Sequence, residues 1–454
     1  MTSVIRRLFG ITPHYPISFM LVSRGRNPSA GEVITQAVSN PELRGRILTT
    51  IGLLLLVRVG IYIPMPGIDR VAFQQFLEGG GQLIGFLDIF TGGGVSSLGI
   101  FALGILPFIN ASIILQLLTA ALPQLEDLQK NEGEAGRRKI AQITRYVALG
   151  WGLVQSVVFS LILRQYATEG LSDLVFVVQT SLALVTGSMV VMWLSEVITE
   201  RGIGQGASLV IFLNIVATLP QTVGGAVTQA QTGDRGTVLD LIKITLVFLA
   251  TIVGIVFVQE ASRRLPIVSA KRQVGGTGTL PNRQSYLPMK LNAGGVMPII
   301  FASAMLFLPV TLAQFAKQEW LSRAVGAIQP GNWPYYLLYF ALILAFAYFY
   351  ASLTLNPTDI ASNLKRGGVA IPGVRPGTAT ANYISGVQAR LTLLGGLFLG
   401  AVVIIPSLIE TTSQVKLGGL GSTSLLILVG VAIDTAKQVQ TYVVSQRYEG
   451  LVRQ

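Results

Sequence analysis

The most constraining feature of this sequence is a series of long apolar runs, each close to twenty residues. A run of that length lets an α-helix cross the hydrocarbon core of a membrane. The runs are continuous, which favours spanning helices over the alternating segments of a β-barrel. The fold class is therefore predicted to be an all-α polytopic membrane protein. We expect about ten spans, at residues 47–66, 82–121, 142–164, 175–196, 206–223, 237–258, 294–314, 336–355, 388–409 and 422–444.

Composition agrees with this class and narrows the chemistry. Of the 454 residues, 51% are hydrophobic and 12% charged, whereas a soluble domain carries about 25% charged residues. The chain has no cysteine and one histidine, His14. That excludes disulfides and argues against a His/Cys metal site or a Ser-His triad. No GxxxxGK phosphate loop and no GxSxG elbow occurs. We expect no enzyme, no catalytic residue, no metal and no cofactor.

One glycine-rich motif could suggest a nucleotide site. GIGQG at 202–206 is incomplete as a dinucleotide fingerprint and lacks the strand-to-helix setting that such a site needs. We interpret it as a tight cytoplasmic turn before a span.

The formal net charge of +12 has two interpretations. It is either the basic bias of a membrane protein with many cytoplasmic loops, or a docking face for an acidic or nucleic-acid partner. Cytoplasmic loops carry the excess of Lys and Arg. Loops 121–145, 260–293 and 356–387 are rich in both residues, and the loops that alternate with them are poorer. Both termini are therefore predicted to lie in the cytoplasm.

Two of these loops, 260–293 and 356–387, are too long to be simple connectors. Far fewer charges would set the topology, so partner docking is favoured. In the second loop, PGVRPG at 372–377 places Arg375 between two Pro–Gly turns. We expect that geometry to project one cation from a rigid loop tip; a merely solvated arginine is the alternative.

An internal echo divides the chain into halves. GILPFINAS at 104–112 resembles GVMPIIFAS at 295–303, and each lies in the second span of its half. Five spans per half would make the second half inverted in the membrane, and such repeats place a functional path at their interface. Pro107 and Pro298 are predicted to bend their helices, either as ordinary packing kinks or as parts of a gate.

Other residues have more than one interpretation. Ile105 and Ile109 are one helical turn apart, as are Ile211 and Ile215. Such pairs usually face lipid or core, but around a pore they would form a constriction that ions cross poorly. Arg58 lies inside the first span and is expected to be structural, packed against a polar neighbour.

The first half of the 82–121 segment is a poor membrane helix. It contains Asp88, three consecutive glycines from Gly92 and two serines from Ser96, and glycine weakens a helix. Irregular backbone at this depth is tolerable where it lines a water-filled cavity. This first half of the segment therefore need not cross the membrane.

Several segments together resemble SecY, the central subunit of the bacterial protein-conducting channel, in its cyanobacterial or plastid-like branch. The likeness runs from about Ser23 to the C-terminus. The segments that carry it are IPMPGID (63–69), IFALGILPFINASIILQLLT (100–119), ITERGIGQGASLVIF (198–212), NPTDIASNLKRGGVAIPGVRPGTATANYI (356–384) and QVQTYVVSQRYEG (438–450).

The resemblance implies ten helices in two inverted halves around an hourglass pore. It implies a pore ring of isoleucines at Ile105, Ile109, Ile211, Ile215, Ile300 and Ile427. It further implies a plug at about 87–98, a short re-entrant element that closes the pore and is hinged near Gly99. The plug residues that it assigns are Leu87, Asp88, Phe90, Gly92, Gly93, Gly94, Ser96 and Leu98.

The same resemblance implies a lateral gate and a docking face. The gate lies between the second and seventh spans, with Pro107, Gln116, Asn292 and Pro298. The docking face for the ribosome and the motor ATPase SecA lies on the two long basic loops. Its residues are Arg263, Arg264, Lys271, Arg272, Lys365, Arg366 and Arg375.

The implied function is a passive, gated channel for unfolded preproteins that also releases transmembrane helices laterally into the membrane. The implied partners are the SecE and SecG subunits, SecA, the ribosome through ribosomal RNA, YidC, signal sequences, nascent chains and membrane lipids. The host is a cell inner membrane, a thylakoid membrane or both. A secondary solute transporter is the alternative, because it shares inverted repeats and broken helices.

The domain organisation predicted on this basis has five parts. They are a cytoplasmic segment at 1–46, a first half at 47–223, an external hinge loop at 224–236, a second half at 237–444 and a cytoplasmic tail at 445–454.

Overall fold

The structure is a computed structural model. It describes residues 31, 40–69, 73, 88, 91–130, 132–167, 172–232, 235–269, 285–316, 332–412 and 422–452. The chain divides into a large unit, residues 46–436, and a small unit formed by residues 1–45 and 437–454. In the small unit, the Asn40 side chain accepts a hydrogen bond from the Glu42 amide at 3.1 Å. The packing below concerns the large unit.

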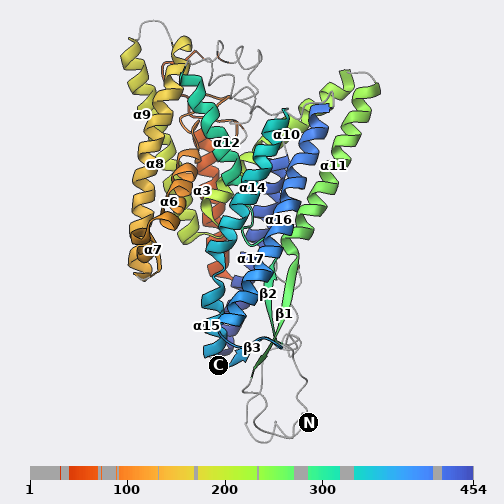
Figure 1. Ribbon diagram of the computed structural model, residues 1–454. Helices are drawn as coiled ribbons and strands as arrows, with labels where there is room; N and C mark the ends of the chain where they lie inside the picture. The colour runs from red at the N-terminus through yellow and green to blue at the C-terminus, as the bar shows by residue number, and fades with distance from the viewer. Residues whose placement is uncertain are drawn as a thin grey trace, which may run out of the picture. The chain divides into compact units, whose positions relative to one another are not determined.

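Ten helices of 16 or more residues occur among the described residues, and each overlaps one predicted span. Six of the large unit's helices are long and apolar enough to cross a membrane, and α6 and the start of α12 are shorter apolar helices. The prediction of a helical membrane protein is thus confirmed (Figure 1). The ten are α3 (Pro41–Ile61), α6 (Leu106–Ala121), α8 (Gly133–Leu163), α9 (Asp173–Arg201), α10 (Gly206–Thr232), α11 (Arg235–Glu260), α12 (Met297–Ala316), α14 (Trp333–Thr354), α16 (Thr378–Thr412) and α17 (Ser422–Val452).

The structure differs from the predicted loop at 224–236. Helix α10 continues to Thr232 and α11 begins at Arg235, so most of this range is helical. The residues after the Gly224–Gly225 pair, with sequence AVTQAQT, include alanines and glutamines, which are good helix formers. They extend the helix past the apolar part of the span.

The described parts of the two long basic loops are folded, and they contain strands that the sequence did not predict. Strands β1 (Ser262–Ser269), β2 (Ser285–Lys290) and β3 (Val369–Ala370) form an antiparallel sheet in the order β2-β1-β3. Apolar side chains on its inner face join one buried cluster with the start of α16: Leu265, Met289, Ile371, Ile384 and Val387. The strands do not stand out in the sequence because several exposed positions are also apolar, and because β1 and β2 each contain a proline, Pro266 and Pro288, which argues against a strand.

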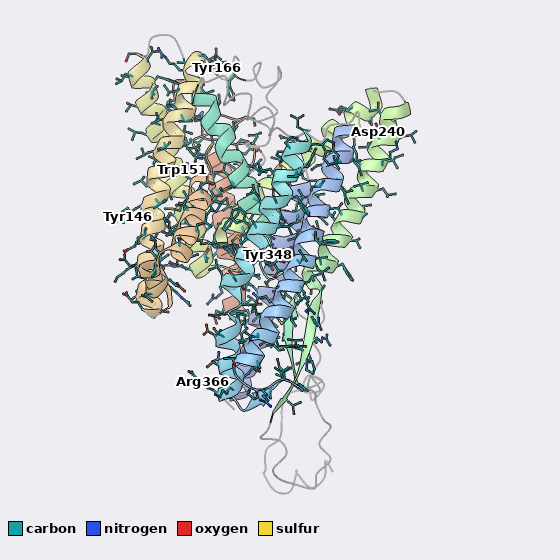
Figure 2. The ribbon with its side chains drawn as sticks, in the orientation of Figure 1. Tyr146, Trp151, Tyr166, Asp240, Tyr348 and Arg366 are labelled. Atoms are coloured by element: carbon teal, nitrogen blue, oxygen red, sulfur yellow. The ribbon has the colours of Figure 1, made fainter. Side chains whose placement is uncertain are left out.

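Short helices complete this end of the molecule. Helix α15 (Pro357–Arg366) begins at Asn356, whose side chain accepts from the Thr358 amide at 3.1 Å. Helix α7 (Pro123–Lys130) follows α6. In Figure 2, Arg366 lies at the opposite end of the helices from Tyr166 and Asp240. The sheet and α15 therefore belong to one end of the large unit.

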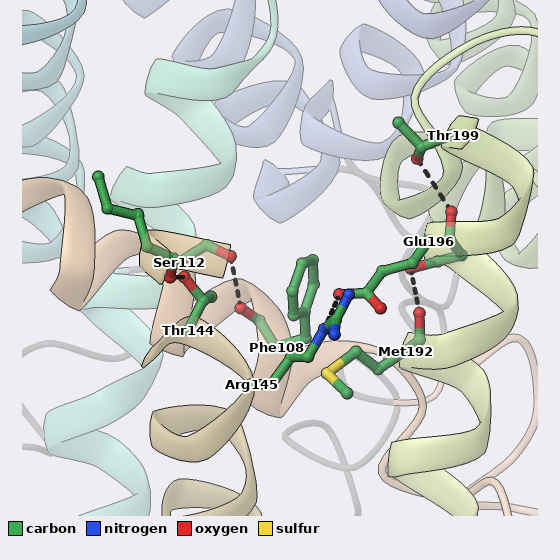
Figure 3. A network of polar contacts seen from close by, with 9 residues as sticks. Phe108, Ser112, Thr144, Arg145, Met192, Glu196 and Thr199 are labelled. Carbon is green, nitrogen blue, oxygen red and sulfur yellow. Dashed lines mark hydrogen bonds and ion pairs between the residues drawn. The ribbon is translucent and has the colours of Figure 1, made fainter. Parts of the chain in front are cut away.

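The GIGQG motif is a tight turn between α9 and α10, as predicted. Gly204 has φ +90°, the left-handed region that favours glycine. The Thr199 hydroxyl accepts from the Gly206 amide at 2.9 Å, and the Thr50 hydroxyl accepts from the Ile203 amide at 3.0 Å. Close by, Arg145 of α8 pairs with Glu196 of α9 at 2.8 Å (Figure 3). Helices α3 and α9 thus fix the entry to α10, and α8 is tied to α9 beside it.

Candidate pore, plug and gate

The six isoleucines predicted for the pore ring all lie in one buried apolar cluster. They come from the start of α6, from α10, from α12 and from α17, so both halves of the chain contribute. None is more than 7% exposed: Ile105, Ile109, Ile211, Ile215, Ile300 and Ile427. Branched aliphatic side chains gathered in this way form a medium that ions cross poorly. Their role as a constriction stays a prediction.

Val296 belongs to the same cluster and was missed from the sequence. It is 5% exposed and takes the place of Ile105 in the echo of 104–112 by 295–303. The echo was therefore a signal that could have found it.

The two echo segments share one backbone geometry, but it is not the bend expected at the prolines. Pro107 is the second residue of α6 and Pro298 the second residue of α12. The first helical turn has no use for the amide hydrogen that proline lacks. In each segment a glycine three residues earlier is left-handed, with φ +51° at Gly104 and +60° at Gly295. Both prolines thus start helices rather than kink them, which corrects the prediction.

The predicted gate residues make contacts between helices. Pro107 packs on α8, where a Cβ at Gly152 would lie 3.6 Å from the proline ring. The Gln116 side-chain oxygen accepts a hydrogen bond from the Tyr350 hydroxyl of α14 at 2.9 Å. The Tyr350 ring in turn lies 5.3 Å from the ring of Phe301 on α12. Tyr350, which the sequence did not suggest, links α6 to α12.

Asn292 and Pro298 shape the approach to α12. The Asn292 amide donates to the Gly295 carbonyl at 2.7 Å, and Asn292 is only 8% exposed. A Cβ at Gly294 would lie 2.7 Å from Pro298 Cγ and 3.1 Å from Tyr350 Cβ. The turn into α12 is therefore packed against both the proline and Tyr350.

The plug segment is residues 87–98, and its described part, Asp88 and residues 91–98, is bonded to itself. The Asp88 carboxylate accepts from the Ser96 amide at 2.9 Å, and the Asp88 carbonyl accepts from the Gly93 amide at 2.8 Å. Gly92 and Gly93 are left-handed, with φ of +70° and +87°, which explains the glycine run. Residues 92–105 are turns, not helix. Leu87 and Phe90 lie outside the described residues.

The plug segment lies against residues that neighbour the isoleucine cluster on two helices. A Cβ at Gly92 would lie 2.6 Å from the Asn214 side-chain oxygen, and Asn214 directly precedes Ile215 on α10. A Cβ at Gly104, next to Ile105, would lie 3.6 Å from Thr91. The start of the plug segment thus packs beside α6 and α10.

The base of the plug segment is tied to the end of α3. The Leu98 carbonyl accepts from the Met65 amide, and the Ile63 carbonyl from the Ile100 amide, both at 2.9 Å. A Cβ at Gly99 would overlap the Ile61 carbonyl oxygen. Leu98 has φ +48° and is buried among apolar side chains with Val95 and Met65. Residues 61–65, the last three of which begin the IPMPGID segment, therefore anchor the plug segment at Gly99.

The predicted docking residues that the structure describes are exposed on the two folded loops. Arg263 and Arg264 lie on β1, and the Arg264 guanidinium stands 4.8 Å from the centre of the Tyr286 ring. Lys365 and Arg366 end α15. Pairing of β1 with β3 joins the two loops into one sheet. Lys271 and Arg272 lie outside the described residues.

Arg375 is presented as the PGVRPG motif predicted. It is exposed between two left-handed glycines, Gly373 with φ +80° and Gly377 with φ +113°. Its carbonyl accepts from the Thr380 hydroxyl at 2.8 Å, and the Val374 amide donates to the Ile371 carbonyl at 3.1 Å. The loop tip is thus pinned on both sides of the arginine.

Comparison with known proteins agrees with this architecture. The sequence model of the family described as SecY matches residues 99–436. A protein translocase subunit SecY from Synechococcus elongatus is 62% identical over 441 residues, which cover 96% of this chain and all of that protein.

Two solved structures share the fold at 17% identity. One, with a TM-score of 0.59, belongs to a study of how the SecY plug domain stabilises the closed translocation channel and maintains a membrane seal. The other, with a TM-score of 0.58, is Sec61 in a canine ribosome-channel complex from the endoplasmic reticulum. Each match covers 87% of this chain and 91% of the other. By its sequence and its fold, the chain belongs to the SecY family.

Proposed function

We infer that this membrane-embedded chain, a protein-conducting channel subunit and not an enzyme, holds its pore closed with two layers. The first layer is the isoleucine cluster, and the second is the plug segment. The contact of Gly92 with Asn214, beside Ile215, carries this proposal. A chain in transit would displace the plug segment and pass through a flexible apolar collar, which limits ion leakage around it.

Opening requires a ligand that favours the open state. A signal sequence or nascent membrane helix that inserts between α6 and α12 shifts the equilibrium by its differential affinity for that state. The Gln116–Tyr350 hydrogen bond and the Tyr350–Phe301 contact support this location, because they would have to rearrange as the helices separate.

The energy for transport comes from a partner on the basic face. Exposed arginines on β1 and at the PGVRPG tip suit a ribosome, whose RNA is polyanionic, and the motor SecA. The Sec61 relative sits in a ribosome-channel complex. SecE, SecG and YidC complete the proposed assembly. The basic sheet faces the cytoplasm, as the positive-inside rule requires, and both termini lie on that side.

A coupled solute transporter fits the structure less well. It would need carboxylates at mid-membrane to bind the coupling ion. Three carboxylates that form ion pairs lie near helix ends: Asp173 with Arg164, Glu196 with Arg145 and Asp240 with Lys243. Each is matched by a cation, so none is poised to carry an ion.

The test is reconstitution with SecE in liposomes. Preprotein import that depends on SecA and ATP supports the proposal. Solute flux without polypeptide movement would exclude it.

The isoleucine layer has its own test. Replacing Ile105, Ile109, Ile211 and Ile215 by glycine should raise the resting ion conductance, roughly tenfold or more, because the apolar barrier is lost. Leucine at the same four positions keeps the apolar volume and serves as the control. Equal conductance of the glycine variant and the unmodified channel would reject the ring.

A further inference from the structure

One charged side chain of α3 contacts the plug segment. Arg58 lies in the last turn of α3, and its Nη1 group donates a hydrogen bond to the Gly92 carbonyl. Its Nη2 group donates to the Tyr62 hydroxyl at 2.7 Å, and its guanidinium carbon stands 5.0 Å from the centre of the Tyr62 ring. The sequence predicted a structural arginine packed on a polar neighbour. That neighbour is the plug segment.

The Gly92 carbonyl is held in place from two sides. Gly92 is buried and left-handed, and its α-carbon packs against Asn214 of α10. Arg58 reaches the same residue from α3. The start of the plug segment is thus clamped between two helices of the first half.

The two attachments of the plug segment differ in kind. At its base, the contacts join neutral groups, chiefly backbone atoms of residues 61–65 and 97–100, with the Ser97 hydroxyl donating to the Ile61 carbonyl at 3.1 Å. At its start, the contact is a charge-assisted bond from a side chain, and such bonds are about twice as strong as neutral ones. A base that stays attached and a start that can let go would make a hinge and a latch.

We propose that Arg58 is this latch, and that its bond to Gly92 sets how strongly a signal sequence must bind before the channel opens. The proposal rests on the plug role inferred above. When the plug segment swings away, water can solvate both Arg58 and the Gly92 carbonyl, so release is reversible. Loss of one such bond corresponds to about a tenfold to hundredfold shift toward the open state.

The test uses a single-cysteine reporter, because the chain has no cysteine of its own. Asn214→Cys places a thiol under Gly92, at a position 1% exposed. In proteoliposomes with SecE, the rate of labelling by a small water-soluble maleimide reports how often the plug segment is displaced. Arg58→Gln in this background should raise the resting rate about tenfold or more.

Three controls separate the latch from general damage. Tyr62→Phe removes the other hydrogen bond of Arg58 but keeps the ring beside its guanidinium, so the labelling rate should stay near that of the reporter alone. Arg58→Lys keeps a cation but offers a point charge instead of a planar fork, so its rate should be intermediate. The Arg58→Lys variant also tests the latch if the Arg58→Gln variant does not fold. Thermal unfolding in detergent checks that each protein is intact.

Addition of a functional signal peptide separates the two proposals. If the peptide speeds labelling of the reporter but Arg58→Gln and Arg58→Lys both keep its resting rate, Arg58 is not the latch and the plug role stands. If the peptide changes nothing, the plug segment does not cover Asn214 and the proposed plug role fails with it.

Discussion

The segments 104–112 and 295–303 begin their helices in the same way but are attached to different parts of the molecule. Each has a left-handed glycine, then a proline in the first helical turn. Each also has a serine that donates back to a carbonyl of its own helix at 2.8 Å, Ser112 to Phe108 and Ser303 to Ile300. Helices α6 and α12 thus start from equivalent caps.

What precedes each cap differs. Helix α6 follows the plug segment, whereas α12 follows strand β2 of the basic sheet. A partner that moves the sheet therefore acts on the start of α12, while displacement of the plug segment acts on the start of α6. The repeat thus supplies two similar helices. With the roles proposed above, one gate helix is attached to the plug segment and the other to the proposed docking face.

The largest effect is expected at Gly99, where the plug segment meets α3. In Gly99→Ala the new methyl group would overlap the Ile61 carbonyl oxygen, and backbone on both sides cannot yield easily. We expect a loss of about 3 kcal/mol in the free energy of unfolding, at the upper end for over-packing. Thermal unfolding measures it.

A similarly crowded glycine in the approach to α12 is Gly294. Its Cβ would meet the Pro298 ring and the Tyr350 side chain, which can shift more readily than a carbonyl. Gly294→Ala should therefore destabilise the protein less than Gly99→Ala. The reverse order would show that the approach to α12 is the more rigid of the two.

The second prediction concerns the docking side. Arg375→Glu reverses the cation at the loop tip and should slow SecA-driven import about thirtyfold, as expected for a contact worth about 2 kcal/mol. Arg137→Glu, an equally exposed arginine on α8, makes the same charge change away from the sheet. Import rates of the two variants are compared, and their unfolding curves check that both are folded. Normal import in Arg375→Glu would remove it from the docking face.

The third prediction tests whether the two caps are equivalent. Alanine at Gly104 or Gly295 has room, since the nearest atoms to the new Cβ lie 3.6 Å away in both. Only the left-handed backbone then penalises the substitution, by about 1–2 kcal/mol. Equal losses in the free energy of unfolding confirm equivalent caps. A much larger loss at one site would show that the two helix starts are not equivalent.

The sequence revealed more of the fold than of its contacts. Each predicted span overlaps a long helix of the described residues, because hydrophobic length is a local property. The bend at Pro107 was wrong because proline suits both a kink and a first helical turn, and only the neighbouring backbone decides. The Tyr350–Gln116 and Arg58–Gly92 hydrogen bonds escaped prediction because each joins residues far apart in the sequence. The separations are 234 and 34 positions, respectively. The strands were hidden by their prolines and their exposed apolar positions.

The smallest expected effect lies where Tyr350 of α14 links α6 to α12. Tyr350→Phe removes one hydrogen bond to Gln116 and keeps the ring on Phe301, so the closed state should lose about 1 kcal/mol. That corresponds to roughly a fivefold gain in affinity for a signal peptide, if the bond breaks as the gate opens. Tyr348→Phe is the control, because its hydroxyl bonds Ala389 of α16 at 3.4 Å, away from α6. Fluorescence titration of a labelled signal peptide compares the two. Equal affinities would mean that the Gln116–Tyr350 bond survives opening, and that α6 and α14 move as one body while α12 alone swings with the sheet.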